Sequence, residues 1–323
     1  MKIYIINPWH VSGGPEIIHQ LCSKINDLGV ECSLVYTFCD IGNYVPKKSD
    51  ENKFIPEYSH YNLRRSFVID DDPKNVIIIP ECYHPSIIHQ VQHMKIIYWW
   101  LSIENPKYSW NLDDPIFKTI FHGCHSEKSI NILSKKINME KIIPLHDHVN
   151  DLFIKSEDEL MFSLKQREKI VLFNPKKQPN EITKTLEKMV TEIDSSIRFI
   201  PIENMSLKEV SLIANKSKLY IDFGFHPGRE RLPREMVISG CSVITGDEGV
   251  SSCYEDVPLI KRKFKRPYDY EKISQFILQE VNNHSSSFFD EELKNYRNIV
   301  RNDKQEFEDN AKKLLEKMNQ DID

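Results

Sequence analysis

The sequence lacks any long hydrophobic run. No stretch approaches the roughly 20 consecutive apolar residues that a helix needs to span a bilayer. The apolar run in the N-terminal segment MKIYIINP is too short for a signal peptide, and polar residues follow it too soon. The net charge of −5 gives no overall attraction to nucleic acid. We therefore expect a soluble, cytoplasmic protein that binds no nucleic acid and binds anions only at local sites.

Paired cysteines are also missing. The seven cysteines are odd in number and form no CxxC spacing, which excludes a regular disulfide framework and a zinc site built on cysteine pairs. We expect reduced and mostly buried thiols, as in cytosolic proteins. The cysteines are Cys22, Cys32, Cys39, Cys82, Cys124, Cys241 and Cys253.

The nucleotide-binding fingerprints of dehydrogenases and ATPases are missing as well. The loop NPWHVSGGPE has paired Gly13 and Gly14 after an apolar run, but neither the GxGxxG spacing nor the spacing of a P-loop. Paired glycines let the backbone approach a ligand closely, and a helix that begins here offers N–H groups to phosphate. An ordinary strand-to-helix turn explains the loop equally well.

The chain does contain short apolar runs that alternate with stretches of helical period, which indicates an α/β fold with helices on both faces of parallel sheets. Because 323 residues exceed one ordinary core, we expect two doubly wound domains, over residues 1–150 and 151–323, the second with charged terminal helices over 290–318. The expected strands are 2–7, 32–38, 75–80, 95–100, 117–122, 141–145, 169–175, 197–202, 218–224, 241–246 and 257–260, and the expected helices include 13–29, 181–193, 207–217 and 232–240.

Two loops of the second half carry cations where ligands bind in such sheets, outside the carboxyl ends of strands. Lys176 and Lys177 follow one strand, where they either reach a diphosphate or stay solvated. The stretch DFGFHPGRERLPREMVISGCSVITG holds a histidine, four glycines and three arginines between buried-looking runs. Its arginines lie just ahead of a helix, where guanidinium groups and the helix dipole act together on an anion.

This stretch also carries a family resemblance. The segment HPGRERLPREMVISGCSVITG resembles the nucleotide-binding stretch of retaining, glycogen-synthase-like GT-B glycosyltransferases, in which a Pro-x-Glu-Ala-x-Ala-x-Gly-x-Pro-Val-Ile pattern follows a glycine-rich loop. SGGPE resembles the glycine loop of the first domain in the same family, so the resemblance covers both halves in the right order. It implies two Rossmann-like domains that face a central cleft. The matching residues are Pro233, Glu235, Gly240, Val243 and Ile244, and Met236, Ile238 and Ser242 depart from the pattern.

The resemblance also implies roles for the donor-binding residues. Glu235 would hydrogen-bond the ribose of a nucleotide sugar, and Gly13 and Gly14 would approach its diphosphate. The expected donor-binding residues are Gly13, Gly14, Lys176, Lys177, His226, Gly228, Arg229, Arg231 and Glu235. The family usually places a second glutamate, which contacts the donor sugar, where this chain has Pro227; Glu230 or His226 is left for that contact.

We place catalysis on Lys177, Arg231 and His125. If fixed cations carry the charge of the leaving diphosphate, no metal or other cofactor is needed. In the retaining enzymes of this family, attack comes from the face that the leaving group vacates, and a phosphate oxygen accepts the acceptor's proton. The resemblance therefore implies that no protein nucleophile takes part.

The acceptor is expected on the first domain, where several polar residues follow strand-like runs. Trp99 and Trp100 beside Glu104 would form an apolar plate with polar edges, although adjacent strand residues point opposite ways and at least one tryptophan is expected in the core. Histidines are the other candidates, and for each of them a structural role is the alternative. The acceptor-binding residues expected are His84, Trp100 and Glu104, and His122 and His125 follow the same kind of run.

Three further motifs have plainer interpretations. The HDHV segment at His146 resembles a metal pair but lacks a third ligand, and the Asp-x-Asp around Asp71 is better explained as a surface turn than as a manganese site. We expect no metal at either place. The basic run KRKFKRP, residues 261–267, is either a solvated loop or a contact with anionic lipid on the inner face of a membrane.

Together these features predict a glycosyltransferase that moves a sugar from a nucleotide-sugar donor to a glycan or lipid-linked saccharide. A role in surface polysaccharide biosynthesis follows from family analogy alone. Two alternatives stay open: a sugar-nucleotide epimerase or hydrolase of the same architecture, and a catalytically silent protein that binds a nucleotide sugar.

Overall fold

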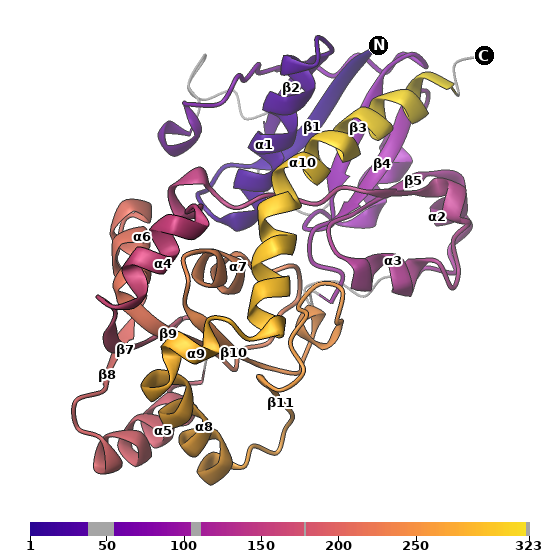
Figure 1. The fold of residues 1–323 in the computed structure, drawn as a ribbon. Coiled ribbons are helices and arrows are strands. Elements are labelled where there is room, and N and C mark those ends of the chain that lie inside the picture. The colour runs from indigo at the N-terminus through magenta and orange to yellow at the C-terminus, as the bar shows by residue number, and fades with distance from the viewer. Residues whose placement is uncertain (38–54, 105–110, 178, 321–323) are drawn as a thin grey trace. The chain divides into compact units, whose positions relative to one another are not determined.

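The computed structural model describes residues 1–37, 55–104, 111–177 and 179–320. These residues form two compact units (Figure 1). Unit 1 runs from Met1 to Asp147 and takes up the chain again at Gln305, whereas unit 2 spans His148–Lys304. The sequence predicted a boundary after residue 150 and gave the terminal helices to the second domain. The structure instead divides the last helix between the two units.

Unit 1 is built on a six-stranded sheet in the order β2-β1-β3-β4-β5-β6, and every neighbouring pair is parallel. Its strands are β1 (Lys2–Pro8), β2 (Glu31–Thr37), β3 (Val76–Pro80), β4 (Lys95–Trp100), β5 (Phe121–Cys124) and β6 (Ile142–Pro144). Its helices are α1 (Gly13–Asp27), η1 (Pro56–Tyr58), η2 (Pro85–Gln90), α2 (Pro115–Thr119), α3 (Glu127–Leu133) and η3 (Met139–Lys141).

Unit 2 is built on a five-stranded parallel sheet in the order β11-β10-β9-β7-β8. Its strands are β7 (Glu168–Phe173), β8 (Arg198–Pro201), β9 (Ser217–Asp222), β10 (Ser242–Gly246) and β11 (Lys263–Phe264). Its helices are η4 (Asp151–Phe153), α4 (Glu157–Leu164), α5 (Asn180–Ile193), α6 (Leu207–Lys216), α7 (Arg231–Ile238), η5 (Val250–Ser252), α8 (Tyr270–Asn282) and α9 (His284–Ser287). The prediction of two Rossmann-like parallel sheets is confirmed.

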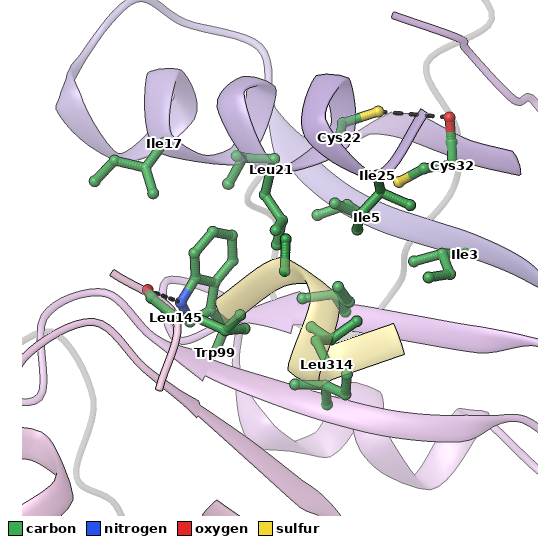
Figure 2. Packing of buried hydrophobic residues seen from close by; sticks show 14 of the residues in the cluster. Ile3, Ile5, Ile17, Leu21, Cys22, Ile25, Cys32, Trp99, Leu145 and Leu314 are labelled. Atoms are coloured by element: carbon green, nitrogen blue, oxygen red, sulfur yellow. Dashed lines mark hydrogen bonds between the residues drawn. The ribbon is translucent and has the colours of Figure 1, made fainter. Parts of the chain in front are cut away.

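Both faces of each sheet are covered, which explains why the strands read as continuous apolar runs. In β1, Ile3 and Ile5 enter one core cluster, whereas Tyr4 and Ile6 enter the cluster on the opposite face. Figure 2 shows the first of these clusters, where side chains of α1, the sheet and the last helix meet. In unit 2, α5 and α8 cover one face, and α6 and α7 cover the other.

The last helix, α10 (Glu291–Gln320), supplies apolar side chains to both units. Leu293 and Tyr296 belong to a core cluster of unit 2, whereas Phe307 and Leu314 belong to the cluster of unit 1 that Figure 2 draws. Trp99 in this cluster is fully buried and donates from Nε1 to the Leu145 carbonyl at 3.3 Å. At least one of the two adjacent tryptophans was predicted to lie in the core, and both are fully buried.

Two predicted strands differ from the structure. Residues 117–119 continue helix α2, because the Asp114 side chain accepts the N–H of Ile116 and Pro115 occupies the first helical position. Within the described residues, 257–260 form no strand, and the edge strand of the sheet is the two-residue β11.

The described cysteines are free thiols, four of them buried, and Cys39 lies outside the described residues. In the described part of the chain, no helix is both long and apolar enough to cross a membrane.

Candidate functional site

The strand order of unit 2 marks one place on its sheet where ligands bind in folds of this class. From β7 the chain moves to β8 on one side and then to β9 on the other, so β7 and β9 flank the point where the winding reverses. Ligands bind outside the carboxyl ends of the strands at such a point. The loop of Lys176 and Lys177 follows β7, and the predicted donor-binding loop follows β9.

Asp222, at the end of β9, organises the start of this second loop. Its carboxylate accepts the Tyr220 hydroxyl at 2.8 Å and the Gly224 N–H at 3.0 Å, and lies 3.4 Å from Nε2 of His226. Burial by itself raises the pKa of Asp222, but its contacts with His226, Tyr220 and Gly224 outweigh burial and hold the pKa below its ordinary value. A buried negative charge therefore fixes the predicted donor-binding residue His226.

Two glycines allow three loops to press together at this edge. A Cβ at Gly224 would lie 2.9 Å from the Lys177 carbonyl, so the loops after β7 and β9 are in close contact. Gly249, in the loop after β10, has a φ of +64°, and a Cβ there would overlap the His226 carbonyl. The next residue, Val250, donates its N–H to that carbonyl at 2.7 Å. The backbone of His226 is thus held from two sides.

Cations and carboxylates are paired across these loops. Lys177 forms an ion pair with Glu230, which stands at the N-cap of α7. Arg231, the first residue of α7, lies with its Nε 3.6 Å from Oε1 of Glu235 one turn later. The structure thus brings Lys177, His226, Arg231 and Glu235 to one edge of the unit 2 sheet, with Lys176 exposed on the same loop and Gly228 buried.

Arg229 was predicted to bind the donor, and in the structure its guanidinium forms a buried ion pair. Arg229 and Arg234 both bind the carboxylate of Asp303 on α10, at 2.7 and 3.1 Å, and all three side chains are buried. One carboxylate with two guanidinium groups joins the donor loop to the last helix of unit 2. This ion pair ties Arg229 to α10, and donor binding by Arg229 stays a prediction.

The winding of unit 1 reverses between β1 and β3, and sequence reasoning missed two polar residues there. Asn7, at the end of β1, is fully buried, and among the described residues neither its side-chain oxygen nor its side-chain nitrogen has a hydrogen-bond partner. Glu81 follows β3 and accepts the Leu101 N–H at 2.9 Å. Burial raises the pKa of Glu81 to about 7, against the effect of hydrogen bonds from backbone N–H groups. The sequence did carry a signal for both residues, because each is a polar residue at the end of an apolar strand.

The predicted glycine pair lies beside these residues. Gly13 and Gly14 open α1, as expected for a strand-to-helix loop. Among the described residues, a Cβ at Gly14 would meet only the Leu101 side chain, at an ordinary contact distance of 3.7 Å.

His125 lies at the end of β5 and is nearly fully buried. Its Nε2 lies 3.0 Å from Oδ1 of Asp147, and its Nδ1 lies 3.3 Å from the Leu101 carbonyl. Both ring nitrogens of His125 thus have partners within unit 1. The catalytic role of His125 stays a prediction.

Each predicted acceptor residue of unit 1 has a partner of its own in the structure. Trp100 is fully buried and donates to Nδ1 of His122 at 3.0 Å, so it offers no surface to an acceptor. His84 is exposed and caps η2 by accepting the Ser86 N–H. Glu104 forms an ion pair with Lys128 at 2.8 Å.

The motifs with plain interpretations also have partners. His146 lies between Glu127 and Glu306, at 3.7 and 3.1 Å. Asp71 accepts three consecutive backbone N–H groups, from Gln92, His93 and Met94, at 2.8 to 3.0 Å. Among the described residues, no group of three or more His, Cys, Asp or Glu side chains is arranged to hold a metal ion.

The basic run at residues 261–267 is largely neutralised by carboxylates. Buried Arg262 binds Glu280, Asp290 and Glu292, at 2.9 to 3.2 Å. Lys265 and Arg266 contact Asp247 and Glu248, at 3.3 and 3.2 Å. The run is therefore a set of ion pairs and not an open basic patch.

Comparison by sequence found no matching protein family and no matching curated protein. Comparison by structure found glycosyltransferases over nearly the whole chain. A glycosyltransferase from Rickettsia africae ESF-5 is 14% identical, covers 99% of this chain and 98% of its own, and has a TM-score of 0.62. The pneumococcal O-GlcNAc transferase GtfA, in complex with UDP and GlcNAc, is 12% identical over 98% and 99%, with a TM-score of 0.61.

Anabaena Alr3699/HepE, in complex with UDP-glucose, is 11% identical over 98% of this chain and 99% of its own, with a TM-score of 0.58. At such identities the likeness establishes architecture and not activity. The chain therefore has the GT-B fold, with two Rossmann-like sheets and a long C-terminal helix, as the sequence resemblance predicted.

Proposed function

We propose that this protein is a glycosyltransferase that moves a sugar from a nucleotide-sugar donor to a glycan or lipid-linked saccharide acceptor. The observation that carries the proposal is the meeting of three strand-end loops beside the winding reversal of unit 2. Lys177 and His226 lie on these loops, and Arg231 and Glu235 lie in helix α7, which follows one of them. Solved proteins of this fold contain UDP or UDP-glucose, so we propose a UDP-sugar as the donor.

In this proposal Glu235 binds the ribose hydroxyls, and Lys176, Lys177 and Arg231 bind the diphosphate. The backbone at His226 and Gly228 lies against the donor sugar, because glycine and a clamped carbonyl allow close approach there. For Gly13 and Gly14 we keep the role that the family resemblance implies, in which the N–H groups at the start of α1 bind a phosphate group.

The acceptor binds to unit 1. The acceptor residues proposed are those predicted from sequence, His84 and Glu104. Asn7 and Glu81, which end strands at the winding reversal, are buried beneath this edge. Trp100 supports this edge from the core.

The chemistry proposed is transfer with retention and without a metal. Negative charge develops on the diphosphate as its bond to the sugar breaks, and Lys177 and Arg231 are fixed cations aimed at that charge. A diphosphate oxygen takes the proton of the attacking hydroxyl, so no protein base is required. By analogy with the glycogen-synthase-like family that the sequence resembles, we also propose a role in surface polysaccharide synthesis, with peripheral contact to the inner face of a membrane.

Thermal unfolding in the presence of a panel of nucleotide sugars tests this proposal. A ligand that binds only the folded protein stabilises it by about 2.7 kcal/mol at one hundred times its dissociation constant. We expect at least one UDP-sugar to raise the Tm, and Lys177→Met to reduce that increase. Lys188→Met, on the exposed face of α5, is the matched control and should leave the increase unchanged.

Four outcomes contradict the proposal or a part of it. No response to any nucleotide sugar refutes donor binding, and rapid epimer formation without an acceptor assigns the site to an epimerase instead. Binding without transfer across a broad acceptor panel indicates a silent binding protein. A strict manganese requirement, seen as complete loss of transfer in EDTA, contradicts the metal-free mechanism.

A further inference from the structure

The ion pair between Lys177 and Glu230 lies at the centre of the proposed donor site. The two residues are 53 positions apart, and they belong to the loops that follow the adjacent strands β7 and β9. The pair therefore bridges the winding reversal of unit 2. A diphosphate bound there by Lys177 would need the place that the Glu230 carboxylate now holds.

The other arginine–carboxylate pairs around this loop are less able to open. Arg229 and Arg234 hold Asp303 with all three side chains at most 5% exposed, and breaking such a buried pair leaves an uncompensated charge. Arg231 and Glu235 are side chains of one helix, one turn apart, and 13% and 5% exposed. Lys177 and Glu230 are 35% and 18% exposed, which leaves water to solvate both groups when they separate.

Glu230 also has a favourable position when it is released. It is the N-cap residue of α7, and its side chain makes no capping hydrogen bond in the structure. The positive end of the helix dipole favours a carboxylate at that position. The flexible four-carbon stem of Lys177 can follow a phosphate group while its backbone stays against Gly224.

We propose that Glu230 is the internal counter-ion of Lys177 in the ligand-free site, and that the donor diphosphate binds by displacing it. This inference rests on the proposed function. Glu230 lowers the affinity for the nucleotide, because each binding event must break the ion pair and bring phosphate charge close to the glutamate. Glu230 therefore favours ligands with two phosphate groups. A single phosphate group interacts with Lys177 less strongly than two do, so it compensates less for the lost ion pair.

The test measures dissociation constants by calorimetry for UDP, UMP and inorganic pyrophosphate. We expect Glu230→Gln to tighten UDP and pyrophosphate about fivefold, the factor that a partly exposed ion pair is worth, and to narrow the preference for UDP over UMP. Glu168→Gln is the matched control, because it removes the same charge from an exposed pair with Arg198 at the other end of β7. It should change none of the three constants.

A double-mutant cycle with Lys177→Met assigns the effect to the pair. In the Lys177→Met background, Glu230→Gln should no longer tighten UDP; an equal gain in both backgrounds would overturn the counter-ion role. Weaker UDP-sugar binding by Glu230→Gln, with UDP unaffected, would make Glu230 a sugar contact instead. If the wild-type protein binds none of the ligands, the proposed function fails; if it binds UDP and Glu230→Gln does not tighten it, only this inference fails.

Discussion

At the scale of single residues, Glu81 shows how burial changes the chemistry of one carboxyl group. Its side chain is buried at the end of β3, and burial raises its pKa to about 7 in the folded protein. The folded state therefore holds this proton more tightly than the unfolded chain, whose glutamate pKa is about 4.5. The stability due to Glu81 is full below pH 4.5 and falls as the pH rises through 7.

We predict that Glu81→Gln removes this dependence on pH. Glutamine keeps an oxygen for the Leu101 N–H but cannot ionise, so relative to wild type the variant should gain about 3 kcal/mol between pH 4.5 and pH 8. Urea unfolding across that range measures the difference. Glu140→Gln, at an exposed site, should show no such gain. If the free energies of unfolding of wild type and Glu81→Gln change in parallel with pH, the pKa of Glu81 is not raised in the folded protein.

Glu235 is the residue on which the assignment of the ribose depends. A hydrogen bond to a charged group contributes about 1.5 to 3 kcal/mol, so we predict that Glu235→Gln raises the donor KM about tenfold or more. Because Glu235 also lies beside Arg231, pyrophosphate, which has no ribose, serves as the control ligand. Its affinity should stay unchanged; equal losses for UDP and pyrophosphate would assign Glu235 to support of Arg231 only.

At the scale of elements, Arg167 joins the C-terminal ends of two helices. Its buried guanidinium donates to the carbonyl of Ala214 in the last turn of α6 and to that of Ser217 just after this helix, at 3.0 and 2.6 Å. It also donates to the Ser239 carbonyl at the end of α7. Helix C-termini carry partial negative charge, so they balance a buried cation without a carboxylate. Burial still lowers the pKa of Arg167 below its ordinary value.

We predict that Arg167→Met lowers the free energy of unfolding by about 3 kcal/mol, because it leaves buried carbonyls without donors. Denaturant unfolding measures this loss. Arg198→Met is the control, since Arg198 is half exposed at the start of β8 and should cost less than about 0.5 kcal/mol. Equal costs for the two variants would show that Arg167 does not join these helix ends.

The elements were more predictable than the site. Apolar runs such as that of β3 identify buried strands without any partner being known, whereas the helical turn at residues 117–119 depended on the cap at Asp114. The donor loop was predictable from its glycines and arginines. The partners of those arginines were not, because Asp303 lies 74 residues beyond Arg229 and only the folded chain brings them together.

At the scale of the whole molecule, the chain passes between the two units twice. It enters unit 2 after Asp147 and leaves it after Lys304, within helix α10. Each unit therefore depends on a different part of one continuous helix for its core. Helix α10 (Glu291–Gln320) contains neither proline nor glycine.

The two ends of α10 allow a test of how independently the units fold. Leu293 and Leu314 are both nearly fully buried, the first in a core cluster of unit 2 and the second in that of unit 1 (Figure 2). Truncation of a buried leucine to alanine costs about 2 to 5 kcal/mol. We predict that Leu314→Ala lowers amide-exchange protection in β1 and β3 and spares β7 and β9, and that Leu293→Ala does the reverse. Each variant is the control for the other, since the substitution and the helix are the same. If both variants lower protection equally in all four strands, the continuous helix makes the protein a single cooperative unit, and nucleotide binding at unit 2 would then stabilise unit 1 by the same amount.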